Sequence, residues 1–144
     1  MDDDRTHAFL SLCALLERWG GLQYATVLRF SETAEGLAGQ RVYTTVPDIY
    51  PTGASKLLPA SPWLDIVHGK AKLFVAADEA TIRAAYPDPE TVFGLGACRL
   101  ANMPVMRGTR RLGLLNVAQG PAHEWVRMEE ALPEAARIAA LLLD

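Results

Sequence analysis

Two apolar stretches near the end of the chain decide the fold: Leu100-Ala101-Asn102-Met103-Pro104-Val105 and Leu112-Gly113-Leu114-Leu115-Asn116-Val117. They lie within predicted strands over 97–107 and 111–119. Gly108-Thr109 separates the two strands and is typical of a turn, so they should form a hairpin. Pro104 cannot donate a ladder hydrogen bond, which favours a sheet edge or a β-bulge at that point.

A helix is predicted at the start of the chain. Apolar residues recur at three- and four-residue spacing through Trp19, and the glycine pair Gly20-Gly21 ends the pattern. Thr6 is the expected N-cap, with Asp3 or Asp4 as alternatives.

A closing helix is predicted over about 122–143. Pro133 lies inside it, so we expect a kink or a split near Leu132. Its last turns, over 138–143, are apolar around more than one face. This favours contact with a partner helix as well as with the sheet, and hence a homodimer through the terminal helices.

Two more strands are predicted over 22–30 and 41–46, joined by a long connection over 31–39. The segment 47–72 is rich in proline and glycine but keeps several large apolar residues, which favours an ordered loop lying over the domain. Near its end, Ser61 should cap a short helix that runs to about His68.

The remaining elements are short. We expect a strand over 73–76, a helix over 79–85 capped by Asp78, and one further helical turn over 89–93. The element order predicts an α+β fold with an antiparallel sheet. The first and last helices should cover one face, and the irregular middle should cover the other and leave a cavity for a ligand.

This pattern resembles a known family. Residues 100–105, a glycine-containing turn, residues 112–117 and a long following helix together resemble the C-terminal half of GAF domains. In that family a Val-Pro pair typically ends one strand, and an apolar-Gly pattern opens the next. The resemblance covers nearly the whole chain, so we expect one GAF-like (profilin-like) domain over residues 1–144.

The resemblance implies a pocket on the face away from the helices, but it does not name the ligand. GAF domains bind cyclic nucleotides, tetrapyrroles, haem, amino acids or aromatic acids, and many form dimers. This chain has neither the Asn-Lys…Phe…Asp-Glu signature of cyclic-nucleotide binders nor the Cys-His pair of bilin binders. Free methionine sulfoxide reductases of this type use several cysteines, whereas here only Cys98 lies in the pocket half and Cys13 lies in the first helix.

Composition narrows the function classes. The chain has 144 residues and a formal net charge of −3, which argues against a nucleic-acid binder that must neutralise phosphates. It has no secretory signal and no apolar run near the ~20 residues of a membrane helix, so we expect a cytoplasmic protein without a membrane partner. Its three histidines have no metal-ligand spacing, and its two cysteines fit a reducing compartment.

The middle loop and the first strand hold four candidate ligand-binding residues: Tyr50, Lys56, Trp63 and Arg29. Aromatic walls with one cation suit an aromatic or carboxylate ligand. The same aromatic residues could instead anchor the loop on the sheet. Arg29 needs an anion if it points inward, and it is a surface charge if it points outward.

Three further candidates lie on the last two strands. Asn102 and Asn116 are polar residues within apolar strands, and each could brace a loop or hold a ligand. A two-residue turn predicts that Asn116 opposes Ala101 and that Asn102 faces the other side of the sheet, whereas a one-residue change reverses this. Cys98 is either a ligand-facing thiol or a small buried residue.

Three functions remain open. The first is a small-molecule-binding sensory domain in signal transduction, of unknown ligand and without an output module, since no kinase, cyclase or helix-turn-helix segment fits in the 144 residues. The second is a redox enzyme of the free methionine sulfoxide reductase type with Cys98 as its nucleophile, so enzyme activity stays uncertain but is disfavoured. The third is a dimerising interaction module with a vestigial pocket.

Overall fold

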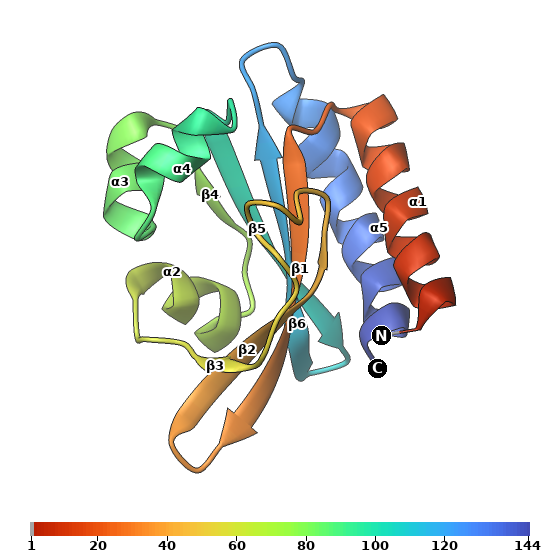
Figure 1. Cartoon of the computed structure of the whole chain (residues 1–144), viewed down its shortest axis with the longest axis vertical. Coiled ribbons are helices and arrows are strands. Elements are labelled where there is room, and N and C mark those ends of the chain that lie inside the picture. The colour runs from red at the N-terminus through yellow and green to blue at the C-terminus, as the bar shows by residue number, and fades with distance from the viewer. Residues whose placement is uncertain (1) are drawn as a thin grey trace.

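The computed structural model describes residues 2–144. Their centre is a six-stranded antiparallel sheet in the order β3-β2-β1-β6-β5-β4 (Figure 1). The strands are β1 (Tyr24–Thr33), β2 (Gly36–Thr44), β3 (Lys56–Leu57), β4 (Phe74–Ala76), β5 (Arg99–Arg107) and β6 (Arg110–Gln119). The predicted α+β class and antiparallel sheet are confirmed.

Two long helices cover one face of the sheet, as predicted (Figure 1). They are α1 (Asp3–Trp19) and α5 (Trp125–Leu143), and α5 packs on β5, β6 and α1. The main hydrophobic core lies between them and the sheet, and Phe9 stacks on Tyr43 of β2 within it, with ring centroids 5.5 Å apart.

The opposite face carries the short elements. These are α2 (Pro62–Leu64), the π-helical turn η1 (Asp65–Gly69), α3 (Glu79–Ala85) and α4 (Pro89–Gly94). Ser61 and Asp78 cap α2 and α3 as predicted, because each side chain accepts a hydrogen bond from a backbone N–H three residues on. Two smaller apolar clusters lie under these elements.

Several predicted boundaries are wrong. The N-cap of α1 is Asp2, whose carboxylate accepts from the Arg5 N–H, since the helix begins three residues before Thr6. The closing helix starts at Trp125 and runs unbroken through Pro133, so it is not split. Both halves of α5 pack on the sheet, and this packing stabilises the helix by more than the loss of one hydrogen bond at Pro133 destabilises it.

The connection between β1 and β2 is also shorter than predicted. Thr33 pairs with Gly36, so the turn has two residues and 31–39 is mostly strand. This hairpin end projects beyond the body of the protein (Figure 1). Residues 31–33 belong to β1 but are exposed to solvent. Their polar composition therefore comes from this exposure, although it resembles that of a loop.

Each of the two hairpins contains a β-bulge. In the first, Val27 pairs with Tyr43 and Leu28 pairs with Arg41, which leaves Val42 as the extra residue. A bulge shifts the alternation of side chains by one residue, so everything beyond it changes face. This shift determines which side chains reach the loop-covered face.

The second bulge lies between Val105 and Met106, and Pro104 itself pairs in register with Leu114. Val105 pairs with Gly113 and Met106 pairs with Arg111, so Leu112 of β6 is the extra residue. The pairing of β4 with β5 ends at Asn102, and Pro104 therefore faces no strand on that side.

Among residues 2–144, no helix combines the length and apolar character needed to cross a bilayer.

Candidate functional site

A cavity of about 690 Å³ lies between the sheet and the short elements on the face away from α1 and α5. Its walls come from β1, β2, β5 and β6, from the loop before α2, and from α3 with the segment that follows it. This size is within the range of pockets that hold small molecules. The predicted cavity on this face is therefore present.

A chain of polar side chains crosses the sheet at the floor of the cavity. The Tyr86 hydroxyl donates to Asn102 Oδ1 (2.5 Å), Asn102 Nδ2 donates to Asn116 Oδ1, and Asn116 Nδ2 donates to Thr26 Oγ1 (3.0 Å). Burial raises the pKa of Tyr86 well above its ordinary value, so its hydroxyl keeps its proton. All four residues line the cavity.

The second bulge brings the two asparagines together. The turn at Gly108-Thr109 has two residues as predicted, but the extra Leu112 moves the register by one. Asn116 therefore opposes Asn102 and not Ala101. The prediction that the two amides face opposite sides is wrong, because it assumed a regular ladder beyond the turn.

Aromatic rings form much of the wall. Tyr24 and Tyr50 lie with ring centroids 5.7 Å apart, and Trp63 stacks on Tyr86 at 6.4 Å. Burial raises the pKa of Tyr24 to about 12, so this phenol is also neutral at physiological pH. Tyr50 and Trp63, which the sequence singles out, both line the cavity.

Two charged residues lie on the same wall, at either side of Tyr50. The Tyr50 hydroxyl donates to Asp88 Oδ2 (2.5 Å), and the Arg41 guanidinium lies over the Tyr50 ring, 5.0 Å from its centroid. Burial, followed by the hydrogen bond to Asp88, raises the pKa of Tyr50. Arg41 and Asp88 supply one positive and one negative charge to the lining.

Sequence reasoning missed Arg41 because of the first bulge. Regular alternation places Arg41 on the same face as Tyr43, which packs in the core against α1. The extra Val42 turns Arg41 to the cavity face instead, opposite Leu28. The run Arg41-Val42-Tyr43 contains no glycine or proline to mark the bulge, so the residues themselves give no signal for it.

The architecture as a whole matches solved structures, while no protein-family model and no curated protein matches the sequence. One similar structure is the GAF domain of a two-component sensor histidine kinase from Bacillus halodurans (TM-score 0.71, 11% identity, 99% of this chain and 94% of that one). Another is the GAF domain of PixJ from Thermosynechococcus elongatus in its blue-light absorbing form (TM-score 0.62, 16% identity, 97% and 84%). The chain has the GAF fold.

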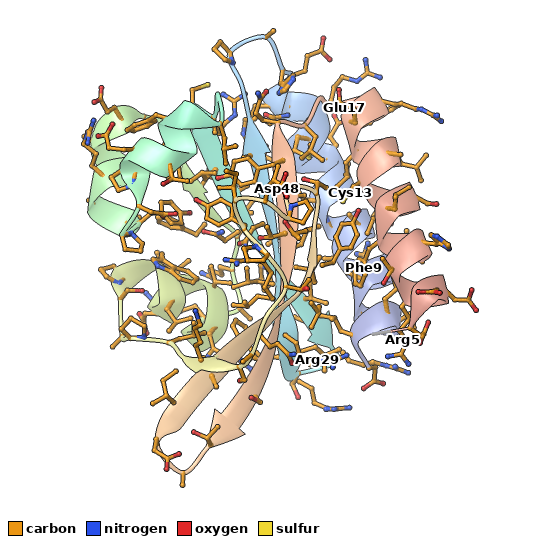
Figure 2. All side chains as sticks on the ribbon, viewed as in Figure 1. Arg5, Phe9, Cys13, Glu17, Arg29 and Asp48 are labelled. Atoms are coloured by element: carbon orange, nitrogen blue, oxygen red, sulfur yellow. The ribbon has the colours of Figure 1, made fainter. Side chains whose placement is uncertain are left out.

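An enzyme is also among the structures that share this GAF fold. It is a type II free methionine-R-sulfoxide reductase from Thermoplasma acidophilum (TM-score 0.65, 10% identity, 98% of this chain and 93% of that one). In the present GAF fold, Cys98 lies outside the main cavity, in a separate depression of about 360 Å³ with Asp78 and Ile82. Cys13 is buried in the core between the sheet and the terminal helices (Figure 2), and burial raises its pKa to about 11. Neither thiol faces the cavity.

Two more candidates from the sequence lie outside the cavity of this GAF fold. Lys56 is exposed on the edge strand β3. Arg29 lies on the helix face of β1, near the end of α5 (Figure 2), where its Nη2 donates to the Leu143 carbonyl (3.1 Å). Across residues 2–144, no three His, Cys, Asp or Glu side chains lie close enough together to hold a metal ion.

Proposed function

We propose that residues 1–144 form a single GAF-type domain that binds a small molecule and acts as a sensor in signal transduction. The observation that carries the proposal is the cavity itself. Aromatic rings, a polar floor and one charge of each sign converge on about 690 Å³ of space. A few convergent polar groups in an otherwise apolar pocket are the usual features of a ligand site.

Packing alone does not account for these side chains. An interface between sheet and loops that only had to be stable is usually filled with apolar groups. Here the polar groups are retained beside open space. The similar GAF domains of a sensor kinase and of PixJ support the sensory role. The free thiols of Cys13 and Cys98 support a reducing compartment such as the cytoplasm.

A thermal-shift screen tests ligand binding. The purified protein is incubated with a panel of amino acids, aromatic acids and nucleotides. A ligand at about 100 times its Kd should stabilise the folded state by about 2.7 kcal/mol and raise the melting temperature. A panel that leaves the melting temperature unchanged throughout contradicts the proposal.

A pair of variants shows whether the effect arises in the cavity. Ala85 of α3 lines the cavity, and Ala85→Trp should fill part of it and abolish the shift. Ala80 is exposed on the same helix and lies outside the lining, so Ala80→Trp should keep the shift. Equal shifts in both variants would place the binding site elsewhere.

We also propose that the domain forms a homodimer through α1 and α5. The support is the set of large apolar side chains that these helices leave exposed: Leu10, Leu15, Trp19, Val126, Ile138 and Leu141. Leu141 is 67% exposed on α5 and lies three residues from the exposed Ile138, so the two side chains are neighbours on the helix surface. Light scattering across a concentration series should show a dimer that Leu141→Glu weakens. A monomer at every concentration contradicts this part.

A further inference from the structure

We infer that the cavity is built for a planar monocarboxylate, with Arg41 holding the carboxylate and Asp88 excluding a second negative charge. This inference rests on the proposed function and adds the chemical class of the ligand. It combines three features of the wall: the state of the Arg41 guanidinium, the position of Asp88 and the aromatic lining.

Arg41 is held in place with part of its hydrogen-bonding capacity unused. Its Nη1 donates to the Pro51 carbonyl (3.0 Å), and its guanidinium lies over the Tyr50 ring. Within residues 2–144 it makes no ion pair and donates no other side-chain hydrogen bond, and its Nε is shielded from water without a partner. The Nη2 group donates no hydrogen bond to residues 2–144, and a guanidinium N–H without a partner can donate a charge-assisted hydrogen bond to a ligand carboxylate.

A comparison with Arg29 shows why the unused hydrogen-bonding capacity of Arg41 indicates a ligand site. Arg29 also has a shielded, unpartnered Nε, but it lies on the helix face and its Nη2 is used at the Leu143 carbonyl. It is a structural tie between β1 and the end of α5. Arg41, by contrast, lines open space and makes no ion pair with a carboxylate of residues 2–144.

Asp88 limits the charge of the ligand. It lies on the same wall as Arg41, where the Tyr50 hydroxyl donates to it. One ligand carboxylate can pair with the Arg41 charge, whereas a second carboxylate on the side of Asp88 would meet a like charge in a partly desolvated site. A hydroxyl or amino group on that side of the ligand can instead donate to Asp88.

The aromatic lining favours a flat ligand body. Rings of Tyr24, Tyr50, Trp63 and Tyr86 line the cavity, and faces and edges of aromatic rings pack well on conjugated systems. The cavity volume of about 690 Å³ accommodates one or two fused rings with a short side chain.

The test compares acids with their neutral amides. Isothermal titration of the full chain uses benzoate with benzamide, trans-cinnamate with trans-cinnamamide, and indole-3-acetate with indole-3-acetamide. Loss of hydrogen bonds to a charged partner should weaken the amide about 10- to 100-fold for at least one pair. Terephthalate, which carries two carboxylates, should bind about tenfold or more weakly than benzoate, because its second carboxylate is repelled by the Asp88 charge.

Variants assign the preference to residues. Arg41→Gln should remove the preference for acid over amide, and Arg29→Gln, a matched change on the other face of the sheet, should keep it. Arg41→Lys retains the charge but not the planar guanidinium, so its preference should be intermediate. Asp88→Asn should improve terephthalate binding relative to benzoate. Urea unfolding of each variant verifies that it is folded, and the acid–amide comparison in the unmodified protein needs no variant.

The outcomes separate this inference from the proposed function. Acids and amides that bind equally overturn the inference and leave a small-molecule pocket in place. A preference for acids that survives Arg41→Gln while Arg29→Gln abolishes it overturns the assignment to Arg41. Terephthalate that binds as tightly as benzoate overturns the role of Asp88. A chain that binds none of these compounds, nor any compound of the thermal-shift panel, overturns both proposals.

Discussion

Replacing Asn102 with leucine should destabilise the protein by about 2–4 kcal/mol, because it leaves two polar groups without partners. Asn102 is only 5% exposed, accepts from the Tyr86 hydroxyl and donates to Asn116. Each buried group that loses its partner costs about 1–3 kcal/mol, and the adjoining cavity lets water reduce that cost. Asn116→Leu should have a similar cost, since it breaks the bonds to Asn102 and Thr26.

The double variant Asn102→Leu/Asn116→Leu measures the coupling energy between the two side chains. Leucine at both positions removes both partners of the Asn102–Asn116 bond at once, so neither amide is left unpaired. The double variant should therefore be more stable than the sum of the single changes predicts, by at least about 1 kcal/mol. Urea unfolding of the four proteins, with all transitions fitted to one m-value, measures this coupling energy.

Additive free energies of unfolding would show that the two amides do not contact each other. Side chains on opposite faces of a sheet do not couple, and independent sites add within about 0.3–0.5 kcal/mol. Additivity would mean that Asn102 and Asn116 do not face each other, and hence that the bulge at Leu112 is absent.

Three further predictions concern the packing and titration of single residues. Gly113→Ala places a methyl group against a backbone carbonyl of β1 and should lower the melting temperature by roughly 5–10 °C, whereas Gly53→Ala, in open space, should not change it. Ellman's reagent at pH 8 should modify the partly exposed Cys98 and leave Cys13 intact, because burial raises the Cys13 pKa to about 11. Equal modification of both thiols in the native protein contradicts this prediction. Stability should fall by at least about 1 kcal/mol per pH unit from pH 10 to 12. The unfolded chain releases the Tyr24 proton that the folded protein retains (pKa about 12), and the raised pKa values of Tyr50 and Tyr86 make the fall steeper. Constant stability over that range contradicts this prediction.

The sequence predicts the elements of this fold well where the hydrophobic pattern is strong. The two last strands, the terminal helices and the caps Ser61 and Asp78 follow from periodicity and capping chemistry, and all are present. The β1–β2 turn fails because residues 31–33 project into solvent, where no apolar alternation marks a strand.

The cavity is less predictable than the fold. Tyr50 and Trp63 stand out in the sequence because aromatic residues are rare in a loop rich in proline and glycine, and both line the cavity. Arg41 and the pairing of the two asparagines depend on one extra residue in each hairpin. A one-residue shift reverses the face of every side chain beyond it, and nothing in the local composition fixes the shift.

Tyr86 and Asp88 were missed for another reason. They follow α3 in a short segment that reads only as the end of a helix before a proline. Their hydrogen bonds to Asn102 and Tyr50 join parts of the chain 16 and 38 residues apart, and such contacts leave no local pattern.

Ligand binding in the cavity can be measured by a ¹H–¹⁵N correlation spectrum recorded while the protein is titrated with the compound that raises its melting temperature most. The chain has three indole N–H groups, of which only that of Trp63 lies in the cavity lining. Trp19 and Trp125 lie on the helix side, under Arg127 and Arg99 respectively. We predict that the Trp63 indole and the side-chain amides of Asn102 and Asn116 shift together and saturate, while the other two indoles stay in place. Shifts confined to Trp19 and Trp125, with the cavity signals unchanged, would contradict the account.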